Sequence, residues 1–306
     1  MRFPDISAQV ERIPFCHRRT YVMGGILSCP RKIQVCLATI LLLLSACAKT
    51  VVYTSADAPL HRGTFAENLA VLPDSFTVVS YNIQYGENID LALADIQRDP
   101  RLHSADVFLL QEMDPEGTET LAHALNLHYV YFPASVHPHH ARLFGNAVLS
   151  RWPITRQSVS ILPHGHPFSG HRRIAVAADL DVAGQTLRVV SVHTATVVTA
   201  QDLRLDQAQA ALDSLAAVNG PVVIGGDFNT IADFEHTLVR RLFRRAGFIQ
   251  ARLPAGPTVK WGLQRVLGLE LVLDHMFFHN LQLLRTGIAR QATASDHLPI
   301  WAVFTW

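Results

Sequence analysis

Residues 221 to 231 read PVVIGGDFNTI. A run of β-branched residues predicts a buried strand, and this run breaks off at two glycines before a carboxylate and a carboxamide, Asp227 and Asn229. Glycine has no Cβ, so the pair permits close backbone approach and unusual dihedral angles where the strand ends. Phe228 between the two polar residues is expected to point into the core. The stretch predicts a strand that delivers polar groups to one edge of a sheet, although a simple Asx turn also fits it.

The same ending recurs on other predicted strands, which run into acidic, amide or imidazole side chains. These side chains are Asn82, Gln111 with Glu112, His193, Asp274, and Asp296 with His297. Each has an ordinary alternative when taken alone: Asn82 fits a turn, Glu112 a solvated loop, and His193 a satisfied core or surface histidine. Six segments that deliver the same chemistry together predict a functional site at the strand ends.

Short apolar runs alternate with amphipathic helical patterns from residue 75 onward. Eight runs read as strands, at 76–81, 107–110, 147–150, 174–180, 187–192, 222–224, 271–278 and 300–304, and four patterns read as helices, at 90–96, 119–125, 199–217 and 233–246. This order predicts one mixed α/β domain over residues 75–306. Residues 48–74 lack strong periodicity and contain two prolines, so they are expected to form a tether leading into the domain.

All four cysteines lie within the first 47 residues, which excludes a disulfide or a thiolate metal site inside the expected domain. Two basic residues precede the apolar run Ile33–Leu44, whose length is typical of a signal-peptide core and shorter than the roughly 20 residues that span a bilayer. The run ends in LSAC, which resembles the bacterial lipobox. Residues 1–47 are therefore predicted to be a signal peptide, with Cys47 as the lipidated first residue of the mature protein. An uncleaved anchor helix is the alternative, and Met23 is an alternative start.

Composition is that of a globular protein, with 49% hydrophobic and 17% charged residues. Residues 1–47 hold six Lys/Arg and two Asp/Glu, and subtracting these from totals of 26 and 25 leaves 20 basic and 23 acidic residues. The mature part thus has a net charge of −3. Proteins that bind long nucleic acids by neutralising phosphates are usually basic, so this balance argues mildly against such a partner.

The chain resembles the exonuclease, endonuclease and phosphatase superfamily, which includes pancreatic deoxyribonuclease, abasic-site endonucleases, neutral sphingomyelinases and inositol-polyphosphate phosphatases. The resemblance rests on seven stretches in the family's order: SYNIQ (80–84), LLQEMD (109–114), GNAVLSRWPI (145–154), VVSVHTAT (189–196), GGDFNT (225–230), LDHMFF (273–278) and SDHLPI (295–300). It implies a four-layer α/β/β/α sandwich of two facing mixed sheets, with the site at one rim. It also implies divalent-metal phosphoesterase chemistry.

The resemblance makes Glu112 the principal metal ligand, with Asn82 beside it and Asp296 approaching the same ion. Carboxylate and amide oxygens suit Mg²⁺, or Mn²⁺ in its place. Orientation and deprotonation of the attacking water are shared by Asp227 and His297, and the sequence leaves open which of the two is the base.

The remaining catalytic assignments also come from the resemblance. Asp274 is expected to orient the imidazole ring of His297 and to favour its charged form. Asn229 is expected to hold the phosphate or the nucleophile. His193 matches the histidine that contacts the scissile phosphate in the deoxyribonuclease and sphingomyelinase branches, and the abasic-site endonucleases differ at this position.

Asn146, Arg172 and Arg173 are candidates to line the phosphate pocket, because arginine presents a fork of donors suited to phosphate. A surface salt bridge is the alternative for either arginine. The histidine-rich stretch 137–140 is interpreted as a solvated rim rather than a zinc site. Four arginines, Arg240, Arg241, Arg244 and Arg245, form a stripe on a predicted helix, which fits a solvated face or a contact with anionic lipid headgroups.

The sequence therefore predicts a metal-dependent hydrolase of phosphate esters in the bacterial cell envelope. It is expected to be a monomer, held by the lipid on Cys47 and facing the periplasm or the exterior. Nucleic acid, phospholipid headgroups and small phosphodiesters remain candidate substrates. A non-catalytic, membrane-anchored binding protein that keeps the fold is the alternative.

Overall fold

The computed structural model describes residues 52–53, 59–67, 71–136, 142–166, 170–196, 199–215, 219–260 and 270–306. The predicted signal peptide with Cys47 and the histidine-rich stretch 137–140 lie outside the described residues. Among the helices that the structure describes, none combines the length and the apolar character needed to cross a bilayer.

The first sheet has seven strands in the order β1-β4-β5-β3-β2-β13-β12. Their bounds are β1 His61–Gly63, β2 Phe76–Asn82, β3 Val107–Met113, β4 His128–Val136, β5 Leu143–Ser150, β12 Gln282–Ile288 and β13 Ile300–Thr305. All neighbours are antiparallel except β2 and β3, which are parallel. Strand β1 lies in the segment expected to be a tether, so residues 61–63 belong to the folded sheet.

The second sheet has six strands in the order β10-β11-β9-β8-β7-β6. Their bounds are β6 Ile154–Ile161, β7 Ile174–Val182, β8 Gln185–His193, β9 Val222–Asp227, β10 Ile249–Gln250 and β11 Asp274–His279. Here β8 and β9 form the single parallel pair among the pairings described. Each sheet is therefore mixed, and each has one parallel pair at its centre.

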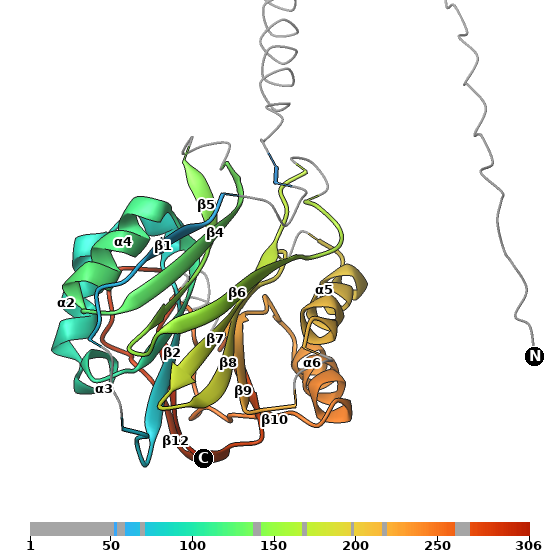
Figure 1. The fold of residues 1–306 in the computed structure, drawn as a ribbon. Helices are drawn as coiled ribbons and strands as arrows, with labels where there is room; N and C mark the ends of the chain where they lie inside the picture. The colour runs from blue at the N-terminus through green and yellow to red at the C-terminus, as the bar shows by residue number, and fades with distance from the viewer. Residues whose placement is uncertain are drawn as a thin grey trace, which may run out of the picture. The chain divides into compact units, whose positions relative to one another are not determined.

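Helices cover the outer face of both sheets (Figure 1). Helices α2 (Ile89–Arg98), α3 (Pro100–His103) and α4 (Pro115–Ala124) lie on the first sheet, and α5 (Gln201–Asp213) and α6 (Asp233–Arg245) on the second; a short 3-10 turn, η2 (Gln84–Gly86), follows β2. Three apolar clusters fill the spaces between the four layers. The predicted α/β/β/α sandwich is confirmed.

The side chains of the central strands alternate between two of these clusters. On β2, Val78 packs between the sheets while Val79 packs under the helices, and on β3 Leu109 and Leu110 divide in the same way. Successive side chains of a strand point to opposite faces, so a strand covered on both sides needs an unbroken apolar sequence. This requirement explains the continuous hydrophobic runs that mark these strands in the sequence.

The two glycines of the GGDFNT stretch face different neighbours. A Cβ on Gly225 would lie 3.1 Å from Cδ1 of Leu109 in the opposite sheet, whereas a Cβ on Gly226 would lie 1.8 Å from the carbonyl oxygen of Val192 on β8. The predicted close approach is thus confirmed most strongly at Gly226. Phe228 is buried against Phe243 and Phe277 under α6, so the prediction that it points into the core is also confirmed.

Replacing Gly226 by alanine is expected to destabilise the fold by about 3 kcal/mol, because the clash is with backbone that cannot rotate away. Urea unfolding followed by circular dichroism measures the loss. The control is Gly220→Ala, whose new Cβ would meet only the Thr186 carbonyl oxygen at 3.7 Å. Equal stability of the two variants would contradict the close approach of β8 and β9 at Gly226.

A buried histidine fixes the loop that follows β9. The Thr230 hydroxyl donates to the carbonyl oxygen of Val272 and lies 2.7 Å from Nε2 of His275, so Nε2 donates to that hydroxyl. The amide of Gln250 donates to Nδ1 of the same ring at 3.2 Å. Burial, reinforced by His236, lowers the pKa of His275 from 6.5 to about 3. The ring is therefore neutral in the fold, and its two nitrogens hold opposite roles.

Because the folded pKa of His275 is depressed, the unfolded chain binds the extra proton first, and stability is lost as the pH falls below 6.5. This group alone should remove about 3 kcal/mol between pH 6.5 and pH 4. Unfolding free energies measured across that range should fall less steeply for His275→Gln than for the wild type. His103→Gln, at an exposed position on α3, is the control. Parallel profiles for wild type and His275→Gln would refute the assignment.

Candidate active site

The two parallel strand pairs end at the same rim of the sandwich, and their last residues converge. Asn82 ends β2 and Glu112 lies near the end of β3, while His193 ends β8 and Asp227 ends β9, where the last two are register partners. Strand β9 packs against β2 and β3, and β8 packs against β3. Four polar side chains from two different sheets are thereby brought together, with Asn82, His193 and Asp227 buried and the Glu112 side chain 12% exposed.

Asn82 joins the carboxylates of the two sheets. Its Nδ2 donates to Oε1 of Glu112 at 3.2 Å and to Oδ2 of Asp227 at 3.1 Å, and its Oδ1 accepts from the backbone of Gln84 at 3.0 Å. The pairing of β3 with β5 shifts register between Leu110 and Met113, and Glu112 in this bulge has φ 58°. Such a backbone conformation is uncommon outside glycine, and here it aims a carboxylate into the site.

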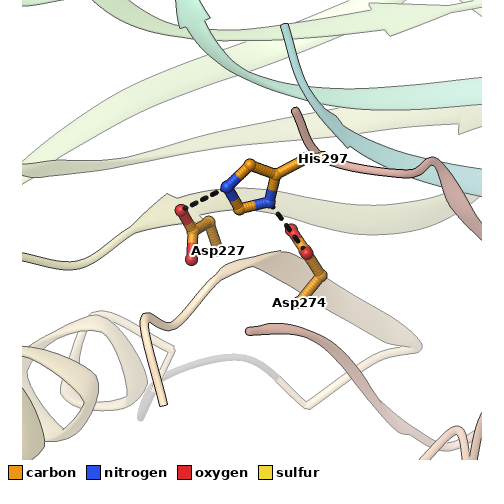
Figure 2. A group of neighbouring side chains, drawn as sticks. All are labelled: Asp227, Asp274 and His297. Atoms are coloured by element: carbon orange, nitrogen blue, oxygen red, sulfur yellow. Dashed lines mark hydrogen bonds and ion pairs between the residues drawn. The ribbon is translucent and has the colours of Figure 1, made fainter. Parts of the chain in front are cut away.

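His297 lies between two carboxylates (Figure 2). Its Nδ1 is 2.9 Å from Oδ2 of Asp274, and its Nε2 is 3.6 Å from Oδ2 of Asp227. Asp274 and Asp227 are register partners on β11 and β9, which fixes their separation. The three side chains form one chain of charge in the order Asp227–His297–Asp274.

Burial and neighbouring charges compete in setting the pKa values of His297 and Asp227. Burial by itself would lower the pKa of His297, but Asp274 and then Asp227 overcome it and raise the pKa to about 10. Burial raises the pKa of Asp227 to about 7, although His297 acts against this rise. The imidazole is therefore the charged partner at neutral pH, and the Asp227 carboxyl titrates close to neutrality.

Arg173 determines which ring nitrogen of His193 carries the proton. Its Nη1 lies 3.0 Å from Nδ1 of His193, and a guanidinium has no acceptor, so Nδ1 must accept and the ring proton must sit on Nε2. Burial, together with the Arg173 charge, holds the pKa of His193 well below its usual range. The Nε2–H then points toward Asp227 at 3.4 Å and Glu112 at 3.8 Å without a hydrogen-bond partner. His193 is a neutral donor in the site.

The donor set fits a hard divalent cation. Burial raises the pKa of Glu112 as well as that of Asp227, and neighbouring carboxylates add to both rises: Asp296 acts on Glu112, and Asp274 and Glu112 act on Asp227. A cation would relieve this repulsion with oxygen ligands. The residues of Figure 2 could also surround an ion, since ligand atoms of Asp227, Asp274 and His297 lie within 4.8 Å of one another. A charged ring flanked by carboxylates at both nitrogens is a proton donor, however, so the Glu112 side fits the cation better.

The structure places most of the predicted residues in this group and gives some of them different tasks. The Asn229 backbone donates to Oδ1 of Asp227 at 2.9 Å, and its side chain donates to the Thr194 carbonyl oxygen at 3.1 Å, so it holds the loop and the carboxylate. The Asp296 backbone donates to Oε1 of Gln84, and its charge adds to the rise of the Glu112 pKa. Asn229 and Asp296 therefore support the residues at the rim through their backbone hydrogen bonds.

Two residues predicted to contact the phosphate, Asn146 and Arg172, are not part of this group. The Nδ2 of Asn146 donates to the carbonyl oxygens of Ile174 and Ser191, at 3.3 and 3.1 Å, and so links β5 to β7 and β8. Arg173 joins the site, whereas Arg172 makes no hydrogen bond or ion pair with the group among the residues described.

Aromatic residues that sequence reasoning did not single out support the site. The Phe144 ring lies 5.2 Å from the guanidinium carbon of Arg173 and 6.0 Å from the His193 ring. Tyr85, at φ 59°, donates its backbone N–H to Oε2 of Glu112, and burial with the Glu112 charge raises its pKa to about 12. Phe144 directly precedes the GNAVLSR stretch and Tyr85 directly follows SYNIQ, so proximity to a motif is the one signal that marks them.

Removing the Arg173 donor is expected to release the fixed tautomer of His193. Long-range proton–nitrogen NMR correlation of the ¹⁵N-histidine-labelled protein should show a single Nε2–H form for His193 in the wild type, and a mixture or a shifted form in Arg173→Met. Arg172→Met is the matched control and should leave the His193 signals in place. An unchanged tautomer in Arg173→Met would contradict the role derived from the 3.0 Å contact.

The sequence matches the model of the Endonuclease/Exonuclease/phosphatase family over residues 79–297. Among curated proteins, it is 29% identical over 122 residues to a UPF0294 protein of Vibrio parahaemolyticus, which is 40% of this chain and 41% of that protein. It is 31% identical over 121 residues to a UPF0294 protein of Vibrio cholerae, with 40% and 41% covered. The chain thus spans about two fifths of the length of the curated relatives it matches.

Several solved structures share the fold. A protein of this family from Beutenbergia cavernae superposes with a TM-score of 0.62 at 20% identity, covering 76% of this chain and 72% of that one. A mannosyl-6-phosphatase of Bacteroides thetaiotaomicron gives 0.61 at 17% identity, covering 76% and 100%. D. rerio TDP2 in complex with a single-stranded DNA product gives 0.61 at 16%, also covering 76% and 100%. At these identities the likeness is one of fold.

Proposed function

Because this chain belongs to the endonuclease/exonuclease/phosphatase family, we propose that it hydrolyses a phosphate ester with the help of a divalent metal ion. The observation that carries the proposal is the buried chain Asp227–His297–Asp274 next to Glu112, Asn82 and His193. Hydrolysis of a phosphate ester needs an oriented water and positive groups facing the phosphoryl oxygens. The described residues supply donors and acceptors for both needs at one rim.

Glu112 and Asn82 would hold the cation, with Asp296 nearby and Mg²⁺ or Mn²⁺ as the ion that their oxygens suit. When bound, such an ion supplies positive charge against the negative charge that builds up on the phosphoryl oxygens. Arg173 contributes a partly buried positive charge beside His193, and the Nε2–H of His193 is a donor for a phosphoryl oxygen.

The water loses its proton to Asp227 in this proposal. A carboxylate with a pKa of about 7 can accept a proton at neutral pH, whereas the His297 ring already carries one. His297 then acts as the charged ion-pair partner of Asp227, at 3.6 Å, and Asp274 orients the ring through the 2.9 Å contact with Nδ1. Asn229 keeps Asp227 in place through its backbone N–H.

His297→Ala is expected to lower kcat by about 10²- to 10⁴-fold, because it removes the charged partner of the proposed base. Turnover is measured on a panel of bis-p-nitrophenyl phosphate, plasmid DNA, sphingomyelin and phosphoinositides with Mg²⁺ or Mn²⁺. EDTA should abolish activity and added metal should restore it. His103→Ala is the matched control, and circular dichroism verifies folding of both variants.

The panel also tests the alternative function. A folded wild type that binds a phosphate ester in the panel without metal-dependent, His297-dependent turnover would be a non-catalytic binding protein. The panel separates candidate substrates as well, since the family likeness leaves nucleic acid, phospholipid headgroups and small phosphodiesters as alternatives.

The location proposed for this hydrolase is the bacterial cell envelope, at its periplasmic or exterior face. The support is the sequence alone: a basic pair, the apolar run 33–44 and the lipobox-like LSAC that ends at Cys47. Buried acyl chains contribute about 0.8 kcal/mol per methylene to membrane binding, so a lipidated Cys47 would hold the chain at a membrane. We expect a monomer in that position.

A further inference from the structure

The first described residues are fastened to the rim that carries the candidate site. Val52 forms an antiparallel bridge with Ser135 near the end of β4, and the backbone N–H of Tyr53 donates to the Ala134 carbonyl oxygen at 3.2 Å. In Figure 1 this short segment lies at the end of the sandwich where the tips of β4 and β5 lie. The entry point of the chain into the domain is thus fixed by backbone pairing.

Contacts connect this entry point to the site. The Ser135 hydroxyl lies 2.7 Å from Nε2 of His171, and the His171 ring meets the Phe144 ring edge-on at 4.8 Å. Phe144 in turn lies beside His193 and Arg173. Two side chains, those of His171 and Phe144, therefore separate the anchoring point at Ser135 from the neutral donor His193.

The same rim carries exposed apolar side chains. Ile231 and Phe234 follow the GGDFNT stretch directly and are 37% and 58% exposed. Ile231 lies in the connection between the carboxyl end of β9, which delivers Asp227, and α6, and Phe234 is the second residue of α6. Single exposed apolar residues are common on soluble proteins, but an aromatic ring at this position is suited to the boundary between headgroups and acyl chains.

The chain length between Cys47 and Val52 is short. The two residues are five positions apart, so even a fully extended chain spans at most about 18 Å. A lipid on Cys47 would therefore keep the rim with Ser135, Phe234 and the site close to the bilayer surface. Headgroups would then be present at the site at a high effective concentration, which a soluble substrate does not share.

We propose that the site rim faces the membrane and that the substrate is a phosphate ester in a lipid headgroup, reached while the lipid stays in the bilayer. This inference rests on the proposed hydrolase function and on lipid attachment at Cys47. It commits the membrane contact to the rim with Ile231 and Phe234. The competing contact is the outer face of α6, where Arg240, Arg241, Arg244 and Arg245 are all exposed. Arg244 lies ten residues after Phe234, about 15 Å farther along the helix.

The test lengthens the tether without touching the fold. The lipidated protein is reconstituted into vesicles of phosphatidylethanolamine and phosphatidylglycerol, also prepared with added sphingomyelin or phosphoinositide. The variants are an insertion of twelve Gly/Ser residues after Lys49 and Cys47→Ala. We expect both to lower the turnover of vesicle lipid by about tenfold and to leave turnover of soluble bis-p-nitrophenyl phosphate unchanged. Unchanged vesicle turnover in either variant would overturn the proposal.

The orientation is tested by surface variants on the same vesicles. The double variant Ile231→Ser with Phe234→Ser should lower the ratio of lipid turnover to soluble turnover several-fold. The control Leu284→Ser, at a 52% exposed site on the edge strand β12, should keep the wild-type ratio. A loss seen instead in Arg244→Gln with Arg245→Gln would place the contact on α6 and overturn the proposed orientation.

Failure of the inference and failure of the proposed function give different results. Absence of metal-dependent turnover of every compound in the panel, vesicle lipid included, would refute the hydrolase itself. Turnover of bis-p-nitrophenyl phosphate or plasmid DNA, but of no vesicle lipid, would keep the hydrolase and overturn the lipid substrate. Loss of acylation only in Cys47→Ala, followed by mass spectrometry, establishes that the tether in these experiments is the one proposed.

Discussion

The structure of the site depends on one buried carboxylate, that of Asp227. Its Oδ2 accepts from Asn82 of the opposite sheet and faces Nε2 of both His193 and His297. A carboxylate so far from solvent is costly unless donors surround it, and these come from four separate strands or loops. The close packing of β8 and β9 at Gly226 is what brings Asp227 to this point. The backbone geometry at Gly226 and the electrostatics around Asp227 therefore depend on each other.

The fold could be predicted from the sequence at its centre but not at its edges. Strands β2, β3, β8 and β9 are apolar on both faces and stand out as unbroken runs. Sequence reasoning missed β1, β6, β10 and β12, which are the four edge strands of the described sheets, as well as β4. Edge strands are short or carry polar side chains, which weakens their signal. In β4 the proline at position 133 lies at a register shift, where a strand tolerates it.

The sequence was enough to predict which residues form the site, but not which contacts each of them makes. Polar residues that end neighbouring parallel strands must meet at one rim, and for that reason Asn82, Glu112, His193 and Asp227 could be found from the sequence. The hydrogen-bonding partner of each polar atom, however, depends on packing between the sheets. Asn146 illustrates this, because its amide is used to tie β5 to the second sheet. The dependence of His193 on Arg173 is likewise a contact between side chains that no local pattern encodes.

The charges of the rim would also couple the binding of the proposed ion to that of the proposed phosphate ester. Glu112, Asp227, Asp274 and Asp296 carry four negative charges when ionised, and Arg173 and His297 carry two positive ones. The remaining charge of −2 matches a divalent cation, and without that cation a phosphate ester would approach a negative site. Each ligand should therefore strengthen the binding of the other, because each removes a repulsion that the other would meet. The neutral form of His193 is consistent with this proposal, since it would offer a donor to the phosphate without adding a positive charge that repels the cation.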